Sequence, residues 1–392
     1  MRFELTEEQL LIQRSAREFA EKEFTSEKGR ECDEKYEFPW ELFRKAARLG
    51  FSGISLPEEY GGQGLGCIEE CLIAEEFNRV DSTLSAILWD GGPFATLVAK
   101  FGSEEQKEKY IPRICKGEIV CAMALTEPNH GSDAGMVGLD TTAVKDGDEW
   151  VINGSKTFIT CGDIAECVTV CCQTDPNAQP PYRGVSMIIV EKGTSGFDTN
   201  SLKPKMGWRG APQAELSFDN VRVPLGNLLG QENRGFHQIM SYFDFSRIPI
   251  AAGAVGIAQG AFERSLKYST QREQFFQPIA NFQITQHKIA EMATKIETAR
   301  LLVHKAAWLI ENKPDKLRLI TRHAAMVKAY AAKVAKEVTD EALQIHSGVG
   351  YVDSDIERFY RDARINDIIE GTGEIQRYIV AREFYREIGF SI

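Results

Sequence analysis

The pattern of hydrophobic residues changes twice along this chain, and the order of the changes constrains the fold. Up to about residue 118, apolar residues recur at three- and four-residue spacing, which predicts amphipathic helices. From Val120, short β-branched runs separated by Gly, Pro and Asp predict strands, and the helical period returns near Gly235. We therefore predict an α+β protein with an N-terminal helical domain at 1–119, a middle antiparallel β domain at 120–232 and a C-terminal helical bundle at 233–392. Segregated blocks of this kind argue against a doubly wound parallel sheet.

Local signals place the first two helices. Thr6 followed by Gln9 is a capping-box pattern, which predicts that a helix begins there. Pro39 suits the first turn of a second helix, whose apolar face runs from Leu42 to Leu49. We expect Gly50 to end that helix.

Composition excludes several classes of protein. The chain has 46 Lys and Arg against 57 Asp and Glu, and this net charge of −11 argues against a general nucleic-acid or anionic-membrane surface. Its nine cysteines include no CxxC pair, so we expect neither a disulfide framework nor a metal site, and a reducing compartment is the simpler reading. No apolar stretch approaches the roughly 18 residues of a membrane span. The expected protein is soluble, cytoplasmic and without membrane insertion.

Two segments near the change from helices to strands could bind a polar ring. Residues 124–134 form a loop rich in hydroxyls, glycine and backbone amides, which could hold a heteroaromatic ring or a phosphate. In the extended segment 153–160, Phe158 and Thr160 point to one face, where one could cover a planar ring and the other bond its edge. The alternatives are an ordinary polar loop and an ordinary strand edge.

Two further segments lie near the C-terminus. Residues 344–351 are a helix end that runs into glycines, with neither the GxGxxG spacing nor the preceding strand of a dinucleotide-binding fold. A helix C-cap is the alternative. In residues 368–377, Glu370 follows two isoleucines and precedes Gly371. Burial there would raise the pKa of Glu370 from about 4.3 toward that of a useful base. The alternative is a solvated helix cap.

Taken together, these four segments resemble the acyl-CoA dehydrogenase family, and the resemblance runs collinearly over essentially the whole chain. It includes the family-like segments 56–62 and 361–364, and Arg272 to Phe275 with Gln283 after them. The resemblance implies an acyl-CoA dehydrogenase-like fold with a C-terminal four-helix bundle, FAD as cofactor, an electron-transferring flavoprotein as electron acceptor, and a homotetramer built as a dimer of dimers.

The resemblance also implies roles for individual residues. Positions that match the surroundings of the flavin ring are Met123, Leu125, Thr126, Ser132, Phe158, Thr160, Thr372 and Glu374. Positions that match the binding of adenine and pyrophosphate, in part across a subunit interface, are Arg272, Phe275, Gln283, Gln344 and Gly348. Positions that match substrate contacts are Ser132, Asp244, Arg247, Glu370 and Gly371.

The implied reaction is α,β-dehydrogenation of an acyl-CoA thioester. Glu370 matches the base that removes the α proton, while FAD accepts the β hydride. Isovaleryl and long-chain enzymes of the family place the base one residue before the arginine that matches Arg247, and this chain has Ser246 there. Glutaryl enzymes carry an arginine near the position of Leu84. The sequence therefore argues against these subfamilies.

Asp90 is the unusual residue, because it falls where relatives line the floor of the acyl pocket. It resembles an acidic residue of dehydrogenases that act on alicyclic CoA thioesters in aromatic compound degradation. We therefore expect a cyclic substrate, cyclohexane-1-carboxyl-CoA or cyclohex-1-ene-1-carboxyl-CoA, with Asp90 as a second catalytic residue beside Glu370. The alternatives are a structural Asp90 in a short-chain or branched-chain acyl-CoA dehydrogenase, an acyl-CoA oxidase, or a non-catalytic CoA-binding protein.

Overall fold

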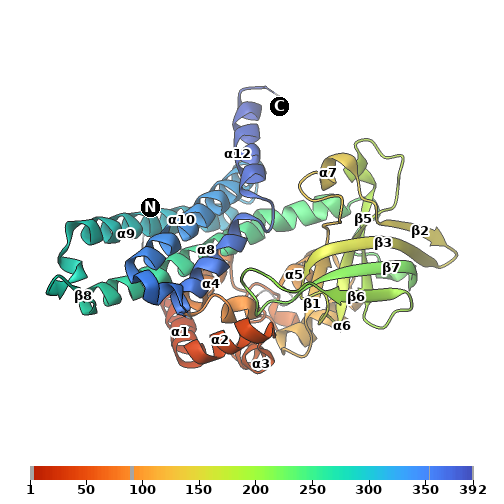
Figure 1. The fold of residues 1–392 in the computed structure, drawn as a ribbon. Helices are drawn as coiled ribbons and strands as arrows, with labels where there is room; N and C mark the ends of the chain where they lie inside the picture. The colour runs from red at the N-terminus through yellow and green to blue at the C-terminus, as the bar shows by residue number, and fades with distance from the viewer. Residues whose placement is uncertain (1–3, 89–91, 353, 391–392) are drawn as a thin grey trace.

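The computed structural model describes residues 4–88, 92–352 and 354–390, and its three blocks follow the predicted order (Figure 1). The N-terminal helices are α1 (Glu7–Glu23), α2 (Ser26–Lys35), α3 (Trp40–Arg48), η1 (Glu58–Tyr60), α4 (Cys67–Val80), η2 (Leu84–Leu88), α5 (Gly92–Phe101) and α6 (Glu104–Cys115). The middle block holds β1 (Cys121–Ala124), α7 (Ala134–Val137), β2 (Thr142–Asp146), β3 (Glu149–Thr160), β4 (Cys167–Gln173), η3 (Pro181–Gly184), β5 (Val185–Glu191), β6 (Phe197–Ser201), β7 (Gln213–Pro224) and η4 (Leu225–Asn227). The C-terminal block holds α8 (Gly235–Gln271), β8 (Glu273–Gln274), β9 (Gln277–Pro278), η5 (Ile279–Asn281), α9 (Gln283–Asn312), α10 (Leu317–Tyr351), α11 (Asp355–Ala363), η6 (Arg364–Asp367) and α12 (Gly373–Glu387).

The first helix begins as predicted. The Thr6 hydroxyl accepts a hydrogen bond from the Gln9 amide at 3.2 Å, and the Gln9 side chain accepts one from the Thr6 amide at 3.0 Å, which completes the capping box. Gly50 ends helix α3 as predicted, since it follows the C-cap residue Leu49 and has φ 86°. Leu49 departs from prediction, because it lies past the last helical residue and is 62% exposed rather than part of the apolar face.

Seven strands form one sheet in the order β1-β4-β2-β3-β7-β6, and β5 pairs with β4. The pairings β2–β3, β3–β7, β4–β5 and β6–β7 are antiparallel, as predicted. The pairing of β1 with β4 is parallel, which the sequence did not indicate. Parallel neighbours need a long crossover connection, and the chain between them, which includes the β2–β3 hairpin, provides it.

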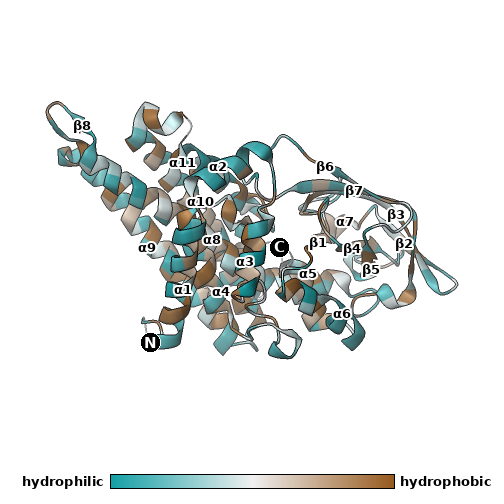
Figure 2. Ribbon diagram, turned by 90° about the horizontal axis from the view of Figure 1, so that it is seen from below, coloured by the Kyte–Doolittle hydropathy of each residue, from teal (hydrophilic) through white to brown (hydrophobic). Residues whose placement is uncertain are grey.

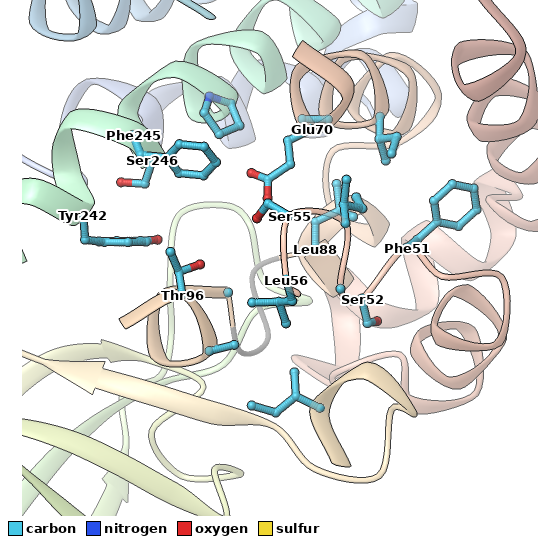
Figure 3. A pocket seen from close by; sticks show the side chains of 18 residues that line it. Phe51, Ser52, Ser55, Leu56, Glu70, Leu88, Thr96, Tyr242, Phe245 and Ser246 are labelled. Carbon is cyan, nitrogen blue, oxygen red and sulfur yellow. The ribbon is translucent and has the colours of Figure 1, made fainter. Parts of the chain in front are cut away.

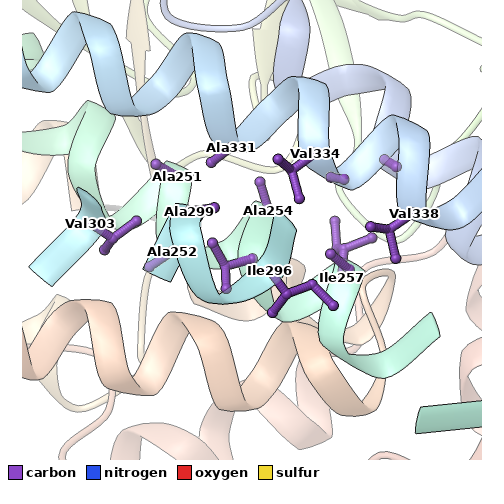
Figure 4. Close-up of a cluster of buried hydrophobic side chains, with 14 of the residues drawn as sticks. Ala251, Ala252, Ala254, Ile257, Ile296, Ala299, Val303, Ala331, Val334 and Val338 are labelled. Atoms are coloured by element: carbon purple, nitrogen blue, oxygen red, sulfur yellow. The ribbon is translucent and has the colours of Figure 1, made fainter. Parts of the chain in front are cut away.

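The long helix α8 joins the N-terminal and C-terminal helices. Gly256 and Gly260 let it approach α4, since a Cβ atom on either would lie 2.2 Å from the carbonyl oxygen of Glu75 or 2.1 Å from that of Arg79. On its other side, small alanines of α8, α9 and α10 form a close-packed core with Val303 and Ile296 (Figure 4).

Hydrophobic and hydrophilic residues alternate around the turns of α1 and α9, as amphipathic helices require (Figure 2). Among the described residues, no helix combines the length and the apolar character that crossing a membrane would require.

Candidate active site

Glu370 lies in a tight turn between η6 and α12. Its φ is 51° and that of Gly371 is 96°, so two successive residues adopt the left-handed conformation. Such a conformation is uncommon for a residue other than glycine and persists only where the surroundings hold it. The Thr372 hydroxyl accepts a hydrogen bond from the Ile375 amide and thereby caps α12. Glu370 is therefore not the helix cap.

Three side chains from three helices hold the backbone of this turn. Gln376 donates to the carbonyl oxygens of both Glu370 and Gly371 at 3.0 Å. Arg247 of α8 donates to the carbonyl oxygen of Glu370 at 3.2 Å, and Lys328 of α10 donates to that of Gly371 at 2.8 Å. These bonds offset the strain of the turn and fix the direction of the Glu370 side chain.

The carboxyl group of Glu370 is poised to exchange a proton near neutral pH. Burial raises its pKa to about 7, while a hydrogen bond from Ser246 and the charges of Arg247 and Lys328 oppose the rise. The Ser246 hydroxyl donates to Oε2 of Glu370 at 2.6 Å. Ser246 occupies the alternative base position described above, and it lies against the carboxyl group of Glu370. The two candidate base positions are therefore neighbours in the fold.

Ser246 also borders a cavity of about 80 Å³ between α4, α5, α8 and the segment that follows α3 (Figure 3). The cavity wall is mostly apolar, with polar groups at a few points. It is lined by Phe51, Ser52, Gly53, Ile54, Ser55, Leu56, Glu70, Ile73, Ala74, Leu88, Gly92, Ala95, Thr96, Ile114, Tyr242, Phe245, Ser246 and Pro249. Asp90, the predicted second catalytic residue, lies outside the described residues, although Leu88 and Gly92 on either side of it line the cavity.

A fully buried ion pair connects the loop of residues 124–134 to β3. Lys156 Nζ lies 2.8 Å from Glu127 Oε1 and donates to the carbonyl oxygen of Leu125 at 3.0 Å. Glu127 also accepts the backbone amides of Asp140 at 2.6 Å and Thr141 at 2.8 Å. The loop that holds Thr126 and Ser132 is therefore anchored at its first half, while Ser132 itself is exposed.

Phe158 presents its ring to solvent at the end of this strand. Its side chain is 64% exposed, Thr160 is partly exposed, and the two flank the buried Ile159. The backbone is less regular than expected, because Phe158 has φ 58° and the β3–β7 register shifts between Lys156 and Ile159. Met123 and Leu125 are partly buried beside them.

A second group of predicted cofactor residues lies at the far end of α8. Arg272 follows the last residue of α8, Phe275 is 83% exposed between β8 and β9, and Gln283 begins α9. Stacking of Tyr268 on His346, with ring centroids 4.4 Å apart, brings the last turns of α10 to the same end. Gln344 and Gly348 are exposed there.

The last turns of α10 contain the predicted helix end. Regular helix stops at Ser347, whose φ of 57° and ψ of −142° are not helical, and a further short helical stretch with Gly348 and Gly350 runs to Tyr351. A Cβ on Gly348 would meet no atom within 4 Å, so the backbone there is open to close approach.

The two predicted cofactor groups do not meet within one chain. Figure 1 shows the β8 hairpin and the sheet at opposite ends of the molecule. Phe158 offers a planar aromatic surface at one end, and Arg272 offers a cation suited to pyrophosphate at the other. The residues fit the two halves of FAD in type, and their separation fits a cofactor shared by two chains.

The predicted substrate residues Asp244 and Arg247 are engaged within the protein. Asp244 accepts a hydrogen bond from the Thr321 hydroxyl at 2.6 Å and lies 3.8 Å from Arg247. Arg247 is 4% exposed and bonded to the turn of Glu370. Its observed contacts hold the Glu370 backbone.

Sequence reasoning missed five residues of the site. Glu127, Lys156 and Gln376 each lie inside a predicted segment, but the polar residues around them gave no signal that set them apart. Lys328 is one of several cations in an alanine-rich helix, but it falls at helical spacing with Ala324 and Ala331 and so on an apolar face. Glu70 carried no signal, because an acid in the first turn of a helix is ordinary.

Comparison with known proteins agrees with this geometry. Family models described as the N-terminal, middle and C-terminal domains of acyl-CoA dehydrogenase match residues 6–118, 122–221 and 233–385. An acryloyl-CoA reductase (NADH) of Anaerotignum propionicum is 45% identical over 98% of this chain and 96% of its own length. A cyclohex-1-ene-1-carbonyl-CoA dehydrogenase of Syntrophus aciditrophicus is 39% identical over 97% of this chain and 90% of its own.

Solved structures give the same result. A chain of the structure described as the electron transferring flavoprotein of Acidaminococcus fermentans superposes with a TM-score of 0.92 at 43% identity, covering 98% of this chain and 100% of that one. With three domain models matched in order and relatives aligned over nearly their full length, the protein belongs to the acyl-CoA dehydrogenase family and is an FAD-dependent oxidoreductase that acts on CH–CH bonds.

Proposed function

We propose that this protein interconverts a short acyl-CoA thioester and its α,β-unsaturated counterpart, with Glu370 as the base that takes the α proton. The observation that supports the proposal is the Glu370 carboxyl group, whose pKa rises to about 7 and which accepts a hydrogen bond from Ser246 at the border of the cavity. A base works best when its pKa lies near the working pH.

The protein residues orient the reacting groups. Gln376, Arg247 and Lys328 fix the turn, so that the Glu370 amide presents a stable donor for the thioester carbonyl, where charge develops as the α proton leaves. Bound FAD supplies the acceptor for the β hydride. Phe158 and Thr160 would hold its ring, with Thr126, Ser132, Thr372 and Glu374 around it. Its adenine and pyrophosphate would be held from a neighbouring chain by Arg272, Phe275, Gln283, Gln344 and Gly348.

The size of the cavity favours a short acyl group. Its volume of about 80 Å³ is roughly half of the ~150 Å³ of an engineered cavity that takes up benzene. The relative that acts on acryloyl-CoA handles a three-carbon acyl group, in agreement with this size.

A cyclic substrate is the second candidate. It rests on Asp90 beside the cavity in the sequence and on the relative named for cyclohex-1-ene-1-carbonyl-CoA. In that reading Asp90 acts on the ring together with Glu370, and the Asp90→Asn variant loses activity on cyclohexane-1-carboxyl-CoA while it retains activity on butyryl-CoA.

We further propose a homotetramer in which pairs of chains share FAD, an electron-transferring flavoprotein as redox partner, and a cytoplasmic location. The separation of the two cofactor groups supports the shared site, and the structural relative from Acidaminococcus supports the partner.

Anaerobic titration of the purified flavoprotein tests the function. Butyryl-CoA should bleach the flavin absorbance, and crotonyl-CoA should restore it in the reduced protein. Retained colour with every short, branched and cyclic acyl-CoA would refute the proposal. Rapid reoxidation by air without an electron-transferring flavoprotein would instead identify an oxidase.

A further inference from the structure

The cavity beside Glu370 contains a second carboxyl group that the proposed chemistry does not use. Glu70 lies in the first turns of α4, and Figure 3 shows its carboxyl group directed toward Ser55 and the middle of the cavity. Its neighbours Phe51, Ile73 and Leu88 are apolar. Burial of a carboxyl group in such surroundings costs free energy unless a polar partner forms a hydrogen bond with it.

The fold does not need Glu70 to begin helix α4. The first amides of that helix already have carboxylate partners, because Glu69 accepts the amide of Gly66 at 2.9 Å and Glu311 accepts that of Ile68 at 2.9 Å. Glu70 faces the cavity instead, and its pKa rises to about 7 because burial outweighs a hydrogen bond with Ser55. Within residues 4–88, 92–352 and 354–390, no cation forms a salt bridge with it.

Glu70 and Glu370 lie at two different parts of one cavity wall. Ser246 bonds the carboxyl group of Glu370 and also lines the cavity that Glu70 enters from α4. A thioester whose α carbon meets Glu370 therefore directs its tail into the space that the Glu70 carboxyl group enters. An alkyl tail would desolvate that carboxyl group without adding to its hydrogen bond with Ser55, whereas a tail with a donor would give it a further hydrogen bond.

We propose that Glu70 is a specificity-determining residue that selects acyl-CoA thioesters whose tail ends in a hydrogen-bond donor, a hydroxyl or an ammonium group. The inference rests on the proposed function, since it takes the cavity as the acyl site. A hydroxyl tail is neutral and an ammonium tail is charged. Binding of the two tails should therefore respond differently when Glu70 loses its charge.

Three thioesters with tails of equal size test the proposal: valeryl-CoA, 4-hydroxybutyryl-CoA and 4-aminobutyryl-CoA. In Glu70→Ala, kcat/KM for the two donor tails relative to valeryl-CoA should fall at least about tenfold, the cost of one hydrogen bond to a charged acceptor. Glu70→Gln keeps an acceptor oxygen without the charge. It should retain a preference for the hydroxyl tail and lose that for the ammonium tail. Glu69→Gln, on the same helix outside the cavity lining, is the matched control and should leave all ratios unchanged.

Binding separates this inference from the proposed function. Calorimetry on the FAD-loaded Glu370→Gln protein measures the preference without turnover. A tenfold tighter Kd for a donor tail, lost in the Glu70→Ala/Glu370→Gln double variant, supports the role of Glu70 even if the flavin is never bleached. If Glu70→Ala and Glu70→Gln change kcat/KM and Kd for all three thioesters by the same factor, Glu70 does not select the tail and the proposal is overturned.

Discussion

Removal of the Ser246 hydroxyl should shift the pH at which the enzyme becomes active. The hydroxyl donates to Oε2 of Glu370 at 2.6 Å and lowers the pKa of that carboxyl group, because it stabilises the charged form. A hydrogen bond to a charged group contributes about 1.5–3 kcal/mol, and one pKa unit corresponds to about 1.4 kcal/mol, so Ser246→Ala should raise the pKa by about one to two units.

The magnitude follows from the fraction of ionised base. With the pKa of Glu370 at about 7, about a quarter of the protein carries the carboxylate at about pH 6.5, against about 3% if the pKa is about 8. Turnover of butyryl-CoA should therefore fall roughly eightfold at about pH 6.5 and less than about twofold at about pH 9.

The assay is kcat against pH with butyryl-CoA and an artificial electron acceptor. Ser246→Thr keeps a hydroxyl at the same place, so the midpoint of its profile of kcat against pH should equal that of the wild type. Profiles of Ser246→Ala and wild type that differ by a constant factor at every pH would show that Ser246 does not tune the base.

Three other changes have defined outcomes. Glu370→Gln should retain bound FAD, visible in its absorbance, and lose about 10²–10⁴-fold in turnover; full activity would refute its role as base. Lys156→Met leaves Glu127 buried without its cation and should destabilise the protein by about 3 kcal/mol in urea denaturation, while Lys156→Arg should lose less; equal losses would contradict a charge effect. Burial raises the pKa of Glu70 to about 7, above its unfolded value of about 4.3, so the stability it contributes is complete below about pH 4 and is lost as pH rises to about 7. Glu70→Gln should therefore raise the thermal midpoint relative to wild type at about pH 8 and not at about pH 4; the same gap at both pH values would exclude this linkage.

The order of helices and strands could be predicted because periodicity is a local property. Thr6 and Gln9 fix a helix start through neighbours three residues apart, and the structure confirms the capping box. The parallel pairing of Cys121 with Cys167 joins residues far apart in sequence, and no local pattern encodes it.

The candidate site likewise combines features that local sequence predicts with contacts that only the folded chain forms. Glu370 could be selected from its flanking residues and from resemblance, but its pKa depends on contacts from Ser246, Arg247 and Lys328, which only the folded chain brings together. Glu70 shows the limit most clearly. Its sequence context is that of a surface acid. Its side chain lines a cavity because α4 packs over the segment after α3.

Helix α8 has a genetic consequence. It carries Ser246 beside Glu370 and ends directly before Arg272, and at 1.5 Å per residue Ser246 and Arg272 lie roughly 40 Å apart along its axis. If each FAD spans two chains, each chain contributes Glu370 to one active site and Arg272 to another. Substitutions at these two positions of one chain then impair two different active sites. A cell that expresses one copy with a defective Glu370 and another with a defective Arg272 would then assemble some intact sites from two inactive chains, so the two alleles would complement each other.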